Sequence, residues 1–258
     1  MSKIELCNSK FRELFGDIKF PIGETDPDFY NIMKHFIYGE VSFQGNLDDK
    51  MRELITLVVF TTNQTLDEIK VHVGASLKVG LTPTEIKEAI YHCAPYIGFS
   101  KTLNSIYQVN EAFKERNISL PMESQKQTTE ENGYEEGLKA QKIIFGDIID
   151  KMQESTPENQ KHIQSYLSAY CFGDIYTRSG LDLKTRELLT FCILCTLGGC
   201  ENQIRGHIQG NANMGNDKET LLSALTQCMP YIGFPRTLNA LACINEIIPE
   251  NKGGNTDS

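Results

Sequence analysis

The chain is an internal duplication, and this feature constrains its fold more than any other. When the 258 residues are compared with themselves, one series of short motifs occurs twice in the same order. The matched segments are 15–18 with 145–148, 39–41 with 173–175, 47–54 with 181–188, 95–99 with 230–234, and 102–104 with 237–239. The offset between the copies drifts only from 130 to 135 residues, so few insertions separate them. The chain therefore consists of two homologous halves.

The composition between and after the two copies predicts where they end. We expect the first repeat to span residues 1–116 and the second to span residues 137–249. Segment 117–136 is rich in Ser, Gln, Thr, Glu and Asn, which is typical of an exposed linker. Residues 250–258 are predicted to form a flexible tail.

Apolar residues recur at helical spacing in both halves, so the predicted fold class is all-α: two homologous helical domains in tandem. One helix is predicted to begin at 47–48, and its counterpart to run from about 182 to 197, where a Gly-Gly pair ends it. Thr82, Pro83 and Glu85 supply an N-cap, a first-turn proline and a first-turn acid for another helix. Signals for β-hairpins are absent from the sequence.

Composition excludes several classes of function. The net charge is −9, which disfavours a nucleic-acid-binding surface or a polybasic membrane anchor. The longest apolar run, 54–60, is too short to span a bilayer, and the first residues lack a signal-peptide core, so we expect a cytoplasmic protein. The eight cysteines are expected to be free thiols. The single Cys-x-x-Cys lacks a second pair of ligands, so no metal site is predicted.

A histidine occurs at the same place in both halves, beside residues that could take part in chemistry. Cys200, Gln203 and His207 share one face of a predicted helix over 200–214. Their counterparts in the first half are Thr65, Glu68 and His72. Glu187 and Glu53 precede these helices and can return beside the histidines across a helical hairpin. A histidine next to a carboxylate predicts a general acid/base site, and a histidine that serves packing alone is the alternative.

A thiol site is a second interpretation of the same helix. Cys195 and Cys200 lie five residues apart across the Gly-Gly break, and His207 could lower the pKa of a neighbouring thiol. Cys192 lies in an apolar helical run and is predicted to be a core residue. Tyr96 and its counterpart Tyr231 follow prolines and could place phenols in a pocket.

Both halves resemble the carboxymuconolactone decarboxylase family, which includes the alkylhydroperoxidase-D-like proteins. The residues that carry the resemblance are segments 173–175, 186–190, 201–207 and 231–235 with Asn239, and in the first half His72 with 96–99. The resemblance covers about 25–115 and 140–248. It implies an all-helical oligomer, and a fused tandem implies a homotrimer with pseudo-hexameric symmetry.

The decarboxylase branch of the family implies removal of carbon dioxide from a small carboxylated lactone or related acid, with no metal or organic cofactor. In that reading His207 is the acid/base group and Glu187 orients it. Arg205 would hold the substrate carboxylate if its side chain turns into the pocket. Glu201 is a further polar candidate on the same helix, and His72 with Glu53 or Glu68 would form a second site.

The peroxidase branch implies a Cys-x-x-Cys-x-x-x-His motif on this helix. Cys200 takes the first cysteine position and His207 the histidine position, but Gln203 stands at the second cysteine position. A dithiol relay would therefore need Cys195 or another thiol to resolve Cys200. A non-catalytic module that binds a small molecule is the third hypothesis.

Overall fold

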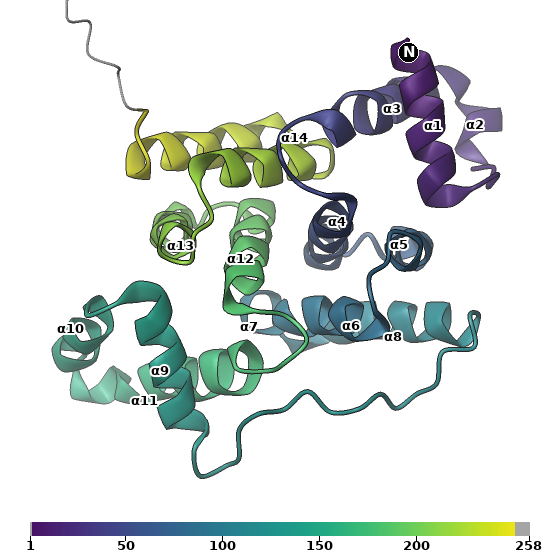
Figure 1. Cartoon of the computed structure of the whole chain (residues 1–258). Helices are drawn as coiled ribbons and strands as arrows, with labels where there is room; N and C mark the ends of the chain where they lie inside the picture. The colour runs from purple at the N-terminus through teal and green to yellow at the C-terminus, as the bar shows by residue number, and fades with distance from the viewer. Residues whose placement is uncertain (1, 251–258) are drawn as a thin grey trace, which may run out of the picture.

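A computed structural model describes residues 2–250, and it is all-α, as the sequence predicts (Figure 1). No strand occurs in that range. The predicted tail lies outside the described residues from residue 251 onward. The helical elements of the chain are α1 (Lys3–Phe15), α2 (Ile22–Thr25), α3 (Pro27–Gly39), η1 (Val41–Phe43), α4 (Asp49–Asn63), α5 (Leu66–Lys78), α6 (Pro83–His92), α7 (Ala94–Ile97), α8 (Phe99–Lys114), α9 (Gly133–Phe145), α10 (Ile148–Ser155), η2 (Glu158–Gln160), α11 (Lys161–Tyr166), η3 (Leu167–Tyr176), α12 (Leu183–Leu197), α13 (Glu201–Asn213) and α14 (Lys218–Ile247).

Local capping residues start and stop these helices where the sequence predicts. Asp48 caps α4 by accepting a hydrogen bond from the backbone of Met51, and Asp182 caps α12 in the same way. Thr82 and Glu85 form a reciprocal capping box at the start of α6. The repeated Pro-Tyr-Ile-Gly-Phe segments leave helical geometry at Gly98, whose φ is 83°, and at Gly233, whose φ is 77°.

The two halves share one hydrophobic core. Helices α4 and α12 pack against each other at the centre of the molecule, with α14 and α6 beside them (Figure 1). The core side chains on these two helices include Leu57, Val58, Phe191 and Ile193, all with no exposed surface. Burial of this shared surface holds the repeats together, so residues of one repeat can reach the site of the other.

Each histidine helix is covered by the first helix of its own repeat. Helix α1 packs on α5, and α9 packs on α13. These covering helices lie at opposite corners of Figure 1, with α1–α3 at the upper right and α9–α11 at the lower left. Residues 115–132 connect α8 to α9 without helix and cross the lower edge of that view. No helix within residues 2–250 combines the length and apolar character that a bilayer span requires.

Candidate active site

His207 and Glu187 meet across the hairpin of α12 and α13. His207 Nδ1 lies 2.9 Å from Glu187 Oε2, and the glutamate side chain is fully buried. The second carboxylate oxygen, Oε1, accepts a hydrogen bond of 2.8 Å from the Tyr176 hydroxyl. Both oxygens of Glu187 are thus fixed, and because Nδ1 is occupied, Nε2 is the ring nitrogen left for chemistry.

A glycine on α13 allows this close approach. A Cβ atom at Gly210 would lie 2.7 Å from Glu187 Oε2 and 2.9 Å from the Phe145 ring, distances that real Cβ atoms essentially never show. The next residue, Asn211, donates a hydrogen bond of 2.9 Å to the backbone carbonyl of Glu187. The two helices are therefore locked in register at the acid/base pair.

Behind the pair lies a network of buried hydroxyl groups that both repeats supply. The Tyr176 hydroxyl is 2.7 Å from the Tyr96 hydroxyl and 2.6 Å from Thr190 Oγ1. Tyr96 belongs to the first repeat and enters the site of the second. Burial raises the pKa of both phenols well above the ordinary value, so they keep their protons and act as hydrogen-bond donors. His92, also from the first repeat, closes the network at 2.8 Å from Thr190 Oγ1.

His207 and Tyr96 lie on the wall of a cavity of about 550 Å³. Most of the remaining wall is apolar and includes Phe145, Ile148, Met152, Leu167, Phe172 and Leu194. Among the described residues that line it there is no lysine or arginine. Its polar side chains include Gln203, which the sequence places on the histidine face, and Gln141.

Gln141 is a buried donor with no acceptor. Its side chain has no exposed surface, its oxygen accepts a hydrogen bond of 2.6 Å from Ser168, and its amide nitrogen has no partner within residues 2–250. A buried N–H without an acceptor costs free energy, so a ligand oxygen in the cavity would satisfy it. In the first repeat the equivalent position is Phe11.

The first repeat contains the same pair in a closed setting. His72 Nδ1 lies 2.9 Å from Glu53 Oε2, and both side chains are buried. The rings of Phe15 and Phe60 pack against the imidazole at 5.3 and 5.0 Å. Tyr231 crosses from the second repeat, as Tyr96 crosses in the other direction, but the space beside Glu53 and Tyr231 is only about 10 Å³.

The structure does not bring three of the predicted polar residues to either pair. Arg205 points away from the cavity and donates a hydrogen bond of 2.9 Å to Glu246 on the surface. Glu201 is in the first turn of α13, and its Oε1 accepts a hydrogen bond of 3.5 Å from Asn239 Nδ2. Glu68 is exposed, and the carboxylate that binds His72 is the one from α4.

The thiols are placed unfavourably for redox chemistry. Cys200 caps α13, and its Sγ donates a hydrogen bond of 3.2 Å to the Leu194 carbonyl. Burial and the nearby Glu201 raise the pKa of Cys200, and burial raises that of Cys195 well above the ordinary value. A reactive thiol needs the opposite shift, because the thiolate is the nucleophile.

Four residues of this site are absent from the sequence predictions: Tyr176, Thr190, His92 and Gln141. Thr190 is repeated as Thr56, so self-comparison of the sequence carried a signal for it. The other three differ between the copies and lie 35 to 84 residues apart along the chain, so no spacing rule identifies them.

Comparison with known proteins identifies a family that matches both repeats. The model of the carboxymuconolactone decarboxylase family matches residues 27–110 and 162–246. The chain is 26% identical to the 4-carboxymuconolactone decarboxylase of Acinetobacter baylyi over 47% of this chain and 90% of that protein. It is 22% identical to peroxisomal protein 2 of Schizosaccharomyces pombe over 70% of this chain and 85% of that protein. It is 24% identical to a nitrosuccinic acid decarboxylase of Metarhizium robertsii over 45% of this chain and 80% of that protein.

Proposed function

The chain belongs to the carboxymuconolactone decarboxylase family, and from that premise we propose that its second repeat is a carboxy-lyase site in which His207 moves the proton. The proposed substrate is a small carboxylated lactone or related acid. The proposed reaction uses no metal or organic cofactor.

One observation carries the proposal: the same buried His-Glu pair occurs twice, but only one copy faces an open cavity. His207 lies on the wall of a space of about 550 Å³, which is within the usual range for small-molecule sites. The space next to Glu53 in the first repeat, about 10 Å³, holds nothing larger than a water molecule. The first repeat is therefore proposed to support the fold and to lend Tyr96 to the working site.

The chemistry follows from the groups on the cavity wall. When the bond from the substrate to its carboxylate carbon breaks, carbon dioxide leaves and the electron pair stays behind as a dienolate. In the imidazolium form, His207 delivers its Nε2 proton to carbon, while Glu187 holds the ring by Nδ1. The unpaired amide of Gln141 is the donor proposed for the developing oxyanion.

The apolar wall favours loss of the carboxylate. Arg205 lies outside the cavity, and no lysine or arginine is among the described lining residues. A carboxylate held among such side chains is poorly solvated, and its departure as neutral carbon dioxide relieves that cost. We therefore propose a substrate whose body is apolar and which carries its leaving carboxylate toward His207.

The test is turnover of 4-carboxymuconolactone and of related carboxylated lactones by the parent protein, His207→Gln and His72→Gln. Loss of a general acid/base is expected to lower kcat at least about a hundredfold in His207→Gln. His72→Gln is the matched control, with the same substitution in the closed repeat, and is expected to keep the parent kcat. Equal rates for the parent and His207→Gln would remove His207 from the mechanism. A folded protein that turns over none of these acids would favour a binding module.

A further inference from the structure

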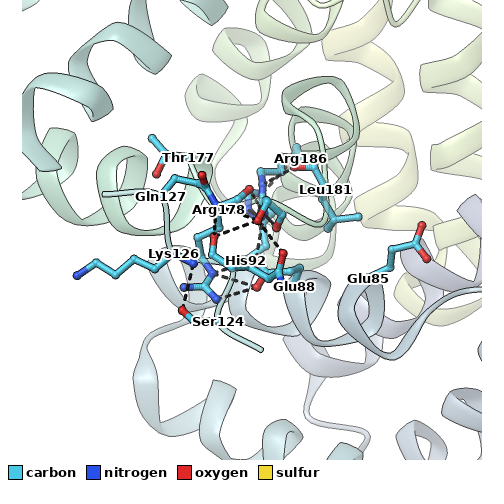
Figure 2. A network of polar contacts seen from close by, with 12 residues as sticks. Glu85, Glu88, His92, Ser124, Lys126, Gln127, Thr177, Arg178, Leu181 and Arg186 are labelled. Atoms are coloured by element: carbon cyan, nitrogen blue, oxygen red, sulfur yellow. Dashed lines mark hydrogen bonds and ion pairs between the residues drawn. The ribbon is translucent and has the colours of Figure 1, made fainter. Parts of the chain in front are cut away.

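A second cavity of about 550 Å³ lies between α6, α8 and the connecting segment near residues 120–125. It shares no lining residue with the His207 cavity. Lys87 and Tyr91 of α6 and Asn110 of α8 form its inner wall, and Arg178, from the second repeat, lies at its edge. Figure 2 shows that edge, where the guanidinium of Arg178 lies beside Glu88 and Ser124.

Lys87 is a buried cation without a carboxylate partner. The residue is 5% exposed, and its Nζ donates one hydrogen bond, to the side-chain oxygen of Asn110. An ammonium group has three N–H donors, and within residues 2–250 no ion pair engages the other two. Burial lowers the pKa of Lys87, and no neighbouring acid opposes that shift. A buried charge in this state is costly unless a counterion reaches it.

The lining carries two cations, Lys87 and Arg178, and two acids, Glu88 and Glu123, but the Glu88 carboxylate is already engaged. Arg178 binds Glu88 through Nε at 3.0 Å and Nη2 at 2.8 Å, and Arg186 binds the same carboxylate at 3.0 Å (Figure 2). One carboxylate therefore serves two guanidinium groups, and Lys87 adds a third cation. Glu123 is the one other acid among the described lining residues.

The wall beside these cations is suited to an organic molecule. The Tyr91 ring lies between them, 5.7 Å from Lys87 Nζ and 5.5 Å from the Arg178 guanidinium carbon. Ile106 of α8 and Met122 of the connecting segment supply apolar surface. A buried ammonium without a carboxylate partner attracts an anion even in a protein whose net charge is −9, because a cavity focuses the field of its own walls.

We propose that this cavity binds a small organic anion, whose charged group pairs with the Lys87 ammonium and whose apolar body packs between Tyr91, Ile106 and Met122. The site is independent of the decarboxylase proposal, because it shares no residue with the His207 cavity.

The experiment is calorimetric titration of the full chain with benzoate, with neutral benzamide, and with inorganic phosphate. Benzoate is expected to bind the parent, and loss of a charge-assisted contact is expected to weaken it about ten- to a hundredfold in Lys87→Met. Lys126→Met is the matched control. It removes an exposed lysine from the adjoining segment and changes the net charge by the same amount as Lys87→Met. Lys126→Met is expected to bind benzoate like the parent, and loss of benzoate binding in His207→Gln would place the ligand in the other cavity.

Four results would overturn the proposal: no benzoate binding at millimolar concentration, binding that survives Lys87→Met, binding that is lost in His207→Gln, or phosphate binding as tight as that of benzoate. A second measurement uses the parent protein, so its result does not depend on whether Lys87→Met folds. Acetylation of Lys87, followed by peptide mass, is expected to slow when benzoate is present, while acetylation of Lys126 is unchanged. Equal rates of Lys87 acetylation with and without benzoate would equally overturn the proposal.

Discussion

The substitution His92→Gln tests how the buried polar network responds to pH. His92 is fully buried, its Nε2 donates to the Arg186 backbone carbonyl at 3.0 Å, and its Nδ1 faces the Arg186 guanidinium at 3.5 Å. Burial first, and the charge of Arg186 second, lower the pKa of His92 well below its ordinary 6.5. The folded protein therefore holds this imidazole neutral at pH values where the unfolded chain protonates it.

The second repeat shows that glutamine can occupy this position. Gln227 is the counterpart of His92, and its side chain accepts a hydrogen bond of 3.0 Å from Arg52 and donates one of 3.1 Å to Thr56. A glutamine at residue 92 can make the equivalent contacts with the arginine and threonine of the other repeat. The variant is therefore expected to fold.

The magnitude follows from proton linkage. The unfolded state takes up a proton on His92 as the pH falls through 6.5, and the folded state does not, so stability is lost as the pH falls. Between about pH 7.5 and about pH 5.5, this one residue is expected to cost about 1.4 kcal/mol of unfolding free energy. His92→Gln should lack that loss, while all other titrating groups contribute equally to both proteins.

Urea unfolding at the two pH values, at one fixed protein concentration, measures the difference. His35→Gln removes an exposed imidazole from the same chain and should retain the parent's pH dependence. If His92→Gln loses as much stability on acidification as the parent does, His92 is not held neutral by burial and the reasoning fails.

Two further predictions concern the hydroxyl network and the assembly. Tyr176→Phe removes a hydrogen bond to a buried carboxylate and should lower the unfolding free energy by about 1.5–3 kcal/mol, whereas Tyr38→Phe, whose hydroxyl has no hydrogen bond within residues 2–250, should cost less than about 0.5 kcal/mol. If urea titrations show that Tyr176→Phe and Tyr38→Phe lose the same unfolding free energy, the hydroxyl network contributes nothing to stability. We propose that the chain forms a homotrimer: Phe99 and Phe234, at equivalent positions in the two repeats, are 64% and 62% exposed. Light scattering should give three times the chain mass for the parent and a smaller mass for the double Phe→Glu variant, and a monomeric parent would refute the proposal.

The fold class and the candidate partners of the two histidines could be predicted because their causes are local, although both Glu53 and Glu68 were open as partners of His72. Helix starts depend on a capping side chain and the next few residues, so Asp48 and Thr82 marked them correctly. The motifs of the second copy repeat those of the first, which fixed the equivalence of the two histidines. A short helical hairpin then leaves few ways for Glu187 and His207 to lie other than side by side.

What the sequence alone determined is a duplicated helical chain with a histidine and a candidate glutamate partner for it in each copy. Which copy is open was decided only by tertiary packing: Phe11 packs against Phe15 and Tyr38 in the first repeat, whereas its counterpart Gln141 lies on the wall of the open cavity in the second. Packing across the shared core also carries Tyr96 into the opposite repeat. These outcomes depend on contacts between segments far apart in the chain, and helical periodicity contains no information about such contacts.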